Sequence, residues 1–337
     1  MTTAVEQLLK PVPAGLYCPI GDFHIDPVLP VARALITHGH ADHARSGHGS
    51  VLASRETLEI MAIRYGKDFC GTRQVAEMGG EIDVNGVKVT FAPAGHVLGS
   101  AQIRVEHGGL RITASGDYKR LPDPTCAPFE PLGCDVFITE ATFGLPVFNH
   151  PAPPKEIEKL LASLHQFPDR AHLVGAYALG KAQRVIRLLR DSGYDEPILI
   201  HGALKRLCDY YEANGIALGP LESATTETKK GAGAGRIVIA PPSAFGSTWA
   251  QRFAEPLLCF ASAWMQIRAR ARQRGTELPL IISDHCDWGE LTATINELDP
   301  QEVWVTHGRE EALTRWCEMH QRKAKPLNLV GYEDEAE

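Results

Sequence analysis

Four potential metal ligands fall within six residues of one short segment, THGHADH at residues 37–43. They are His38, His40, Asp42 and His43. The apolar run RALI precedes them, so we expect a strand that ends where the ligands begin. Imidazole nitrogens and carboxylate oxygens are ligands that zinc takes in a compact shell. In a turning loop, His38 and His40 can point to one side while Asp42 and His43 turn toward a second position. One loop could thus serve two ions.

Further candidate ligands follow other apolar runs of the chain. They are His96 in PAGHVLGSA, Asp117 in SGDY, Glu140 in TEATFG, His285 in SDHCDW and His307 in VTHG. A single histidine of this kind is more often a structural residue than a ligand. Their recurrence at the ends of expected strands would place charged groups at one rim of a sheet. A histidine-rich surface loop without function is therefore the weaker explanation for THGHADH.

Short strands joined by tight turns are expected over residues 1–150. EIDVNGVKVTFAP and AQIRVEHGGLRITASGD each place a turn-forming pair, NG or GG, between two strand-like runs, a pattern that predicts hairpins. Four prolines between residues 146 and 154 then mark a boundary.

The segment after this boundary has a different pattern. KEIEKLLASLHQF and GKAQRVIRLLRDSG have apolar residues at helical spacing and alternate with short apolar runs, which is typical of a parallel α/β domain. From about residue 276, apolar strands that end in His or Asp return. We expect a first domain at 1–150, an inserted domain at 151–275, and a return segment with an acidic tail at 276–337.

Charge is distributed unevenly along the chain. The formal net charge is −7, yet residues 151–275 hold 17 basic and 11 acidic side chains, a net of +6. A basic insert is what local phosphate binding would require, although solvated helix faces would have the same composition. No apolar run reaches the eighteen or so residues of a membrane span, and the N-terminus lacks the features of a signal peptide. The eight cysteines form no CxxC pair, so we expect reduced thiols in a cytoplasmic protein without a membrane partner.

The order of these motifs resembles the metallo-β-lactamase superfamily. The superfamily is indicated by HxHxDH, followed by a lone His and by Asp in SGD, which resemble its motifs. Its β-CASP nuclease branch is resembled by the features that follow: the acidic residue after the next strand, the insert, SDH and THG. PPSAFGSTWAQRF, CFASAWMQIR and SDHCDW are similar to bacterial exonucleases encoded beside an ATP-dependent DNA ligase and a helicase. The resemblance implies an αββα sandwich interrupted by an α/β β-CASP insert. A functional link to the ligase and the helicase is implied as well.

The resemblance also implies a role for each matching residue. Two divalent metal ions, zinc or manganese, would be held by His38, His40 and His96 on one side, by Asp42, His43 and His307 on the other, and by Asp117 as the bridge. Asp26 would orient the loop from behind, with Asp22 as the competing choice. Asp42, His285 and Glu140 would be catalytic, with His285 at the scissile phosphate or leaving oxygen and Glu140 orienting it. Apart from the resemblance, Lys181 and Arg184 at an expected helix start are candidate phosphate contacts of the insert, together with Ser243 and Ser262.

The resemblance implies a metal-dependent nuclease, most specifically a 5′ to 3′ DNA exonuclease that acts in DNA repair, and the basic insert is in keeping with it. The main alternative is a ribonuclease of the RNase J type. His307 favours it, because eukaryotic members acting on DNA tend to have valine there, and Glu140 replaces the aspartate of some DNA-acting members. A small-molecule hydrolase of the same fold is a second alternative, which the basic insert disfavours. A scaffold with a degenerate site is a third, which the complete ligand set disfavours.

Overall fold

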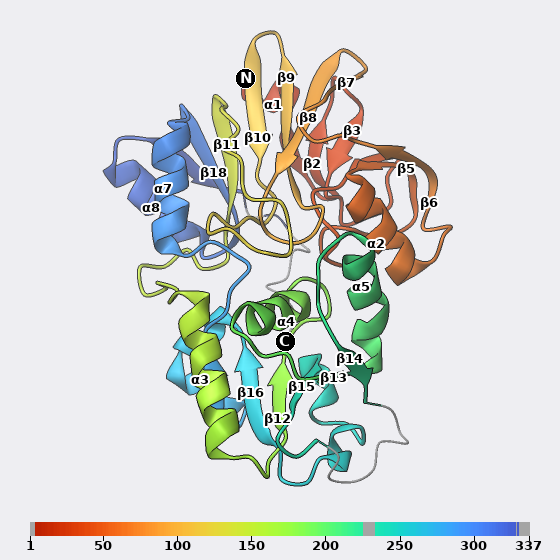
Figure 1. Cartoon of the computed structure of the whole chain (residues 1–337). Helices are drawn as coiled ribbons and strands as arrows, with labels where there is room; N and C mark the ends of the chain where they lie inside the picture. Colours follow the sequence, from red (N-terminus) through yellow and green to blue (C-terminus); the bar gives the residue numbers. More distant parts are fainter. Residues whose placement is uncertain (1–3, 225–232, 328, 330–337) are drawn as a thin grey trace. The chain divides into compact units, whose positions relative to one another are not determined.

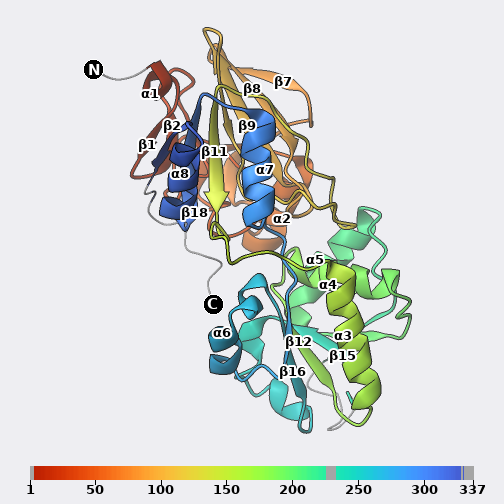
Figure 2. The same cartoon turned by 90° about the vertical axis from the view of Figure 1, so that its left-hand side faces the viewer.

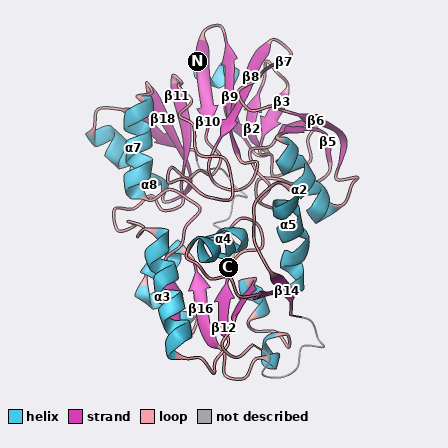
Figure 3. Ribbon diagram, viewed as in Figure 1, coloured by secondary structure: helices cyan, strands magenta, loops and turns pink. Residues whose placement is uncertain are grey.

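The computed structural model describes residues 4–224, 233–327 and 329 of the chain. Its contacts divide the chain into two compact units. Unit 1 is discontinuous and comprises Met1–Asn149 and His285–Ala336, whereas unit 2 comprises His150–Asp284. Both units combine helices with strands (Figures 1 and 3). The acidic tail at 331–337 lies outside the described residues.

Six short strands form the first sheet of unit 1, in the order β1–β2–β3–β4–β5–β6. The first three are antiparallel neighbours, whereas β3 to β6 run parallel. The strands are β1 (Lys10–Val12), β2 (Gly15–Cys18), β3 (Phe23–Ile25), β4 (Arg33–Leu35), β5 (His48–Ala53) and β6 (Cys70–Val75). Two helices, α1 (Ala4–Leu8) and α2 (Arg55–Tyr65), belong to the same stretch of chain. Ser54 starts α2, since its side chain accepts a hydrogen bond from the Thr57 amide.

Seven strands form the second sheet of unit 1, in the order β19–β18–β11–β10–β9–β8–β7. They are β7 (Glu81–Val84), β8 (Val87–Pro93), β9 (Ala101–His107), β10 (Leu110–Ala114), β11 (Val136–Ala141), β18 (Glu302–Gly308) and β19 (Lys323–Pro326). The two predicted hairpins are confirmed. Asn85 and Gly86 turn with φ of 54° and 83° between β7 and β8, and the GG pair joins β9 to β10. β10, β11 and β18 are parallel neighbours, so their carboxyl ends lie at the same edge.

Apolar cores hold the layers of unit 1 together. The two sheets share one core, to which the first contributes Leu16, Ile25, Leu35 and Leu52 and the second Val89, Ile103, Ile112 and Ile138. Residues of β11 alternate between faces, because Val136 and Ile138 enter this core while Phe137 enters another.

Helices cover the remaining faces of both sheets. The first sheet packs Ala34 and Val51 against Leu58 and Met61 of α2. The second packs Phe137, Val303 and Val305 against α7 (Trp288–Leu298) and α8 (Glu310–Met319), through Leu291, Ile295 and Leu313. Figure 2 shows α7 and α8 beside β11 and β18. Unit 1 is thus layered as helix, sheet, sheet and helix.

Unit 2 is built on a parallel sheet of six strands in the order β14–β13–β15–β12–β16–β17. The strands are β12 (His172–Gly175), β13 (Ile198–Ile200), β14 (Leu221–Ser223), β15 (Ile237–Ala240), β16 (Leu257–Ala261) and β17 (Leu278–Leu280). Its α-helices are α3 (Pro153–Gln166), α4 (Lys181–Asp191), α5 (Gly202–Ala213) and α6 (Arg268–Gln273), and its 3-10 helices are η1 (Pro242–Ala244), η2 (Ala250–Arg252) and η3 (Ala263–Gln266). The two segments with predicted helical spacing form α3 and α4. β17 lies beyond residue 276, where the return segment is expected, and pairs with β16 in this sheet. Within the described part of the chain, none of the helices combines the length and apolarity of a membrane span.

Candidate metal centre

The loop that carries THGHADH starts directly after β4 and is held by Asp26, which follows β3. Asp26 Oδ1 accepts a hydrogen bond from the Thr37 amide at 2.7 Å, and Oδ2 accepts one from the Thr37 hydroxyl at 2.5 Å. The same Oδ2 lies 2.8 Å from His43 Nδ1. Because a partner at one ring nitrogen fixes an imidazole, Asp26 turns His43 Nε2 toward the cluster described next. Asp22, the competing candidate, is exposed and accepts a hydrogen bond from the Tyr17 hydroxyl.

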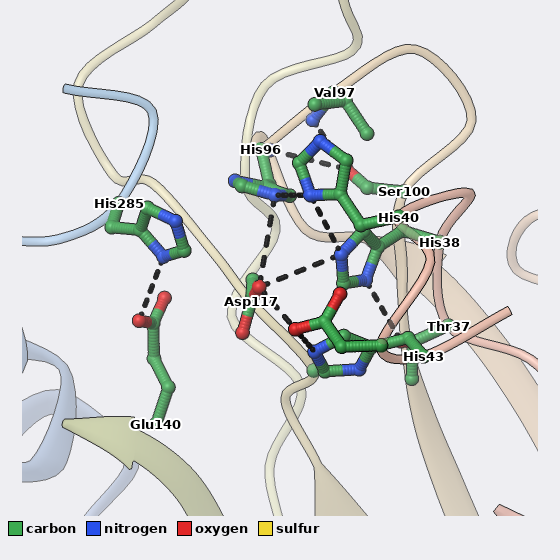
Figure 4. A network of polar contacts seen from close by, with 12 residues as sticks. Thr37, His38, His40, His43, His96, Val97, Ser100, Asp117, Glu140 and His285 are labelled. Carbon is green, nitrogen blue, oxygen red and sulfur yellow. Dashed lines mark hydrogen bonds and ion pairs between the residues drawn. The ribbon is translucent and has the colours of Figure 1, made fainter. Parts of the chain in front are cut away.

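Four side chains of unit 1 converge on one point. His38, His40, His96 and Asp117 each offer a ligand atom, and these atoms all lie within 4.8 Å of one another. His40 Nδ1 is 3.2 Å from His38 Nε2 and 3.0 Å from His96 Nε2. Asp117 Oδ2 is 3.4 Å from His38 Nε2 and 3.8 Å from His96 Nε2 (Figure 4). Three imidazoles and a carboxylate in this arrangement form a ligand set that suits a divalent metal ion.

A tight turn holds His96 in this cluster. Ser100 Oγ accepts hydrogen bonds from the amides of His96 and Val97, at 3.1 and 3.2 Å. Gly95 has φ of 74°, and a Cβ atom there would lie 2.3 Å from the Lys119 carbonyl oxygen, so only glycine fits. Sequence reasoning missed Ser100, because a serine four residues after a histidine carries no signal until the turn is known.

Parallel strands bring three of the expected residues to one edge of the second sheet. Asp117 follows β10, Glu140 lies near the end of β11, and His307 lies near the end of β18. Glu140 is in register with Thr306, the residue before His307. The carboxyl ends of parallel strands are the usual place for a site in such sheets, because the chain leaves them in loops on the same side.

A second group of expected ligands adjoins the first. His43 Nε2 lies 3.5 Å from Asp117 Oδ2 and 3.6 Å from Asp42 Oδ2. The ring of His43 stacks on that of His307 with centroids 5.0 Å apart. Asp117 is therefore next to both groups, which is the place that a bridging ligand would need.

The electrostatics of the cluster fit a cation. Burial, with further effects of His43 and His96, holds the pKa of His38 well below its usual value, so this ring is neutral and keeps a lone pair. Burial also raises the pKa of Asp117 to about 8, against the lowering effect of His43. Asp117 Oδ1 is buried and has no hydrogen-bond partner among the described residues. A positive ion would favour the carboxylate form and satisfy this oxygen.

The second group, Asp42, His43 and His307, also favours a positive charge. Burial and His43 lower the pKa of His307 to about 3, so that ring is neutral too. Burial alone would lower the pKa of His43, but Asp117, Asp42 and Asp26 overcome it and raise that pKa to about 10. Metal ligands must be deprotonated, so a metal ion bound here would replace the proton on His43 and supply the positive charge instead.

Glu140 and His285 form a pair beside the cluster. Glu140 Oε2 lies 2.9 Å from His285 Nδ1 and accepts a hydrogen bond from the Thr142 hydroxyl at 2.6 Å. Its other oxygen accepts one from the Tyr118 amide at 2.8 Å. Asp117, Glu140 and His285 also place one ligand atom each within 4.8 Å of the others. Glu140 therefore fixes the ring of His285, and the pair adjoins the proposed bridge (Figure 4).

The four candidate phosphate contacts lie in unit 2 in different surroundings. Ser243 is exposed. Ser262 is buried, and its hydroxyl accepts a hydrogen bond from the Trp264 amide at the start of η3. Lys181 is 2% exposed and pairs with Asp284, and Arg184 is 3% exposed and donates to the Ser283 carbonyl. The sequence did not reveal these internal partners, because they come from a segment about a hundred residues away.

Comparison with known proteins gives relatives of two kinds. A probable DNA ligase of Opitutus terrae is 27% identical over 316 residues, which is 90% of this chain and 30% of the ligase. Endoribonuclease YSH1 of Eremothecium gossypii is 41% identical over 112 residues, 32% of this chain and 14% of that protein. Cleavage and polyadenylation specificity factor subunit 3 of Dictyostelium discoideum is 36% identical over 126 residues, 36% of this chain and 16% of that protein. The chain thus spans under a third of the length of each of these relatives.

The fold has a counterpart among solved structures. The crystal structure of a protein of unknown function from Enterococcus faecalis V583 aligns with a TM-score of 0.54 and 13% identity, over 84% of this chain and 76% of that one. No protein-family model matches the chain.

The site and the relatives together define the class of this protein. Its converging His and Asp side chains could hold a metal ion, and nucleases are among its relatives. The chain is similar over about a third of its length to the endoribonuclease relatives and over most of its length to the ligase relative, which is consistent with the β-CASP nuclease branch of the metallo-β-lactamase superfamily.

Proposed function

We propose that the chain is a metal-dependent nuclease that hydrolyses phosphodiester bonds. The observation that carries this proposal is the convergence of His38, His40, His96 and Asp117 within 4.8 Å, next to the Glu140–His285 pair. The nuclease relatives support the same reaction class. A scaffold function is disfavoured because every expected ligand is present in the sequence.

The proposed architecture is an αββα sandwich with an inserted β-CASP domain. The helix, sheet, sheet and helix layers of unit 1 support the sandwich. The separate parallel sheet of unit 2, whose residues come in the sequence between the two segments of unit 1, supports the insert. The insert would bind the nucleic-acid backbone, in keeping with its net charge of +6 over residues 151–275.

The proposed site holds two divalent ions. His38, His40 and His96 would hold one, Asp42, His43 and His307 the other, and Asp117 would touch both. Zinc suits the imidazoles and manganese suits the carboxylates. Bound ions of this kind polarise a phosphoryl oxygen and lower the pKa of water.

The chain's own residues would prepare the site for the reaction. Asp26 fixes the ligand loop, and Asp42 would act at the site both as ligand and as catalytic residue. Glu140 holds His285 Nδ1, which leaves Nε2 to contact the scissile phosphate or to protonate the leaving oxygen. The buried surroundings of both side chains strengthen these contacts, because charges interact more strongly away from water.

DNA is the proposed substrate, with strands degraded from a 5′ end as part of DNA repair. The ligase relative supports it because it matches 90% of this chain. RNA is the second candidate, supported by the endoribonuclease relatives and by His307. A functional link to an ATP-dependent DNA ligase and a helicase belongs to the same proposal.

The test uses one sequence made as DNA and as RNA, labelled at either end, with and without a 5′ phosphate. The protein is supplied with zinc or manganese. We expect mononucleotides from the 5′ end of DNA. Release from the 3′ end first, or cleavage of RNA alone, would contradict the substrate proposal, whereas no cleavage of either polymer would contradict the nuclease proposal itself.

A further inference from the structure

The chain that leads to His285 is held by side chains of unit 2 at three points. Glu156 of α3 is buried, and its Oε2 accepts a hydrogen bond from the Ile281 amide at 2.9 Å. Arg184 of α4 donates to the Ser283 carbonyl. Lys181, the first residue of α4, donates from Nζ to Asp284 Oδ1 at 2.5 Å.

The last of these contacts is deeply buried. Lys181 is 2% exposed and Asp284 is 1% exposed. Burying two charges is costly, and removing only one of them is costlier still, so such a pair strongly favours one arrangement of the chain. The α4 end that carries Lys181 is itself fixed, because the Gln183 side chain accepts a hydrogen bond from the Gly180 amide at 2.8 Å.

The chain is equally well fixed on the other side of His285. The Cys286 amide donates to the Tyr118 carbonyl at 2.9 Å, and the Tyr118 amide donates to Glu140. Asp287 then caps α7 through the Glu290 amide. His285 therefore lies between two anchored residues, Asp284 and Cys286, and its ring has Glu140 as partner.

We propose that Lys181 is a positioning residue for His285, acting through Asp284 with Arg184 as its support. The proposal rests on the proposed nuclease function, in which His285 contacts the substrate. This role differs from a direct contact between Lys181 and a phosphate group. The Lys181 charge is already paired with the buried carboxylate of Asp284, and that pair fixes the residue next to His285. Removal of the Lys181 charge should weaken the contact between His285 and Glu140, whereas binding of nucleic acid should persist.

The kinetic test compares Lys181→Met, Lys181→Arg and Arg236→Met in the full-length, metal-loaded protein. Arg236 is the matched control, since it pairs with Glu222 in the same unit. For Lys181→Met we expect kcat to fall roughly 10- to 100-fold, with KM, metal content and the salt dependence of binding unchanged. Lys181→Arg should restore most of kcat, and Arg236→Met should resemble the wild type.

A second readout does not need activity. The ring ¹⁵N shifts of His285, assigned by their loss in His285→Ala, should change in Lys181→Met, return in Lys181→Arg and stay unchanged in Arg236→Met. If Lys181→Met does not fold, the Lys181→Met/Asp284→Asn double variant removes both charges of this pair together and takes its place.

The outcomes separate this inference from the nuclease proposal. A raised KM with a shallower salt dependence, or unchanged His285 shifts, would overturn the positioning role and favour a phosphate contact. A wild type that cleaves no nucleic acid would overturn the proposed function, while the ring shifts would still decide whether Lys181 positions His285.

Discussion

At the scale of single residues, Asp117 is the point where the two ligand groups meet. Its Oδ2 lies within 3.8 Å of ring nitrogens of His38, His43 and His96. The rings of His38 and His43 also lie side by side, with centroids 4.2 Å apart, but Asp117 is the carboxylate that lies within 3.8 Å of both groups. The proposed metal centre therefore depends more on this carboxylate than on any single imidazole.

Asp117→Ala should deprive both ions of a ligand. We expect the reconstituted variant to hold less than one ion per chain by elemental analysis, where the wild type holds two, because a bridging carboxylate serves both metals. Asp123→Ala is a matched control, since Asp123 is also buried but bonds to Thr125 outside the cluster. Full metal content in Asp117→Ala would show that Asp117 is not a bridge.

Substitutions of His285 and His40 should affect turnover and metal content differently. His285→Ala should abolish turnover and leave metal content near normal, because its Nδ1 faces Glu140. His40→Ala should lose both, because His40 Nδ1 faces His38 and His96. Elemental analysis and an activity assay on the same samples check this. Loss of an ion from His285→Ala would make His285 a ligand.

At the scale of elements, the carboxyl ends of strands assemble the site. β4 leads into the ligand loop, and β10, β11 and β18 present Asp117, Glu140 and His307. Asp26 ties the end of β3 to the loop after β4, and it satisfies both the amide and the hydroxyl of Thr37.

Asp26→Ala should loosen this tie. We expect metal affinity to fall roughly 10- to 100-fold, since partners of metal-bound imidazoles typically contribute that much. Unfolding free energy should fall by about 1–3 kcal/mol, because buried hydrogen-bonding groups lose their acceptor. Asp22→Asn, at an exposed position whose φ of 50° asparagine also adopts, should change neither. Metal titration and chemical denaturation check both, and equal effects of the two substitutions would contradict the role of Asp26.

The sequence revealed those parts of the site that local patterns encode. THGHADH, the two hairpins and the helical spacing of α3 and α4 depend on near neighbours, so they could be predicted. Ser100, Tyr118 and Thr142 could not, because their roles as hydrogen-bonding partners arise only when distant strands meet. Lys181 illustrates the limit best. At a helix start it looked available to phosphate, whereas Asp284, 103 residues along the chain, pairs with it.

At the scale of the whole molecule, the central claim is that bound metal drives phosphodiester cleavage by this chain. The most direct measurement strips the protein with a chelator and adds zinc or manganese back in steps. Bound metal per chain and the cleavage rate of end-labelled oligonucleotides are then recorded on the same samples. We predict no cleavage by the stripped protein and a rate that rises to a plateau at two ions per chain, because the two ligand groups share Asp117. Full cleavage by the stripped protein, or a plateau at one ion or fewer, would contradict the two-metal account.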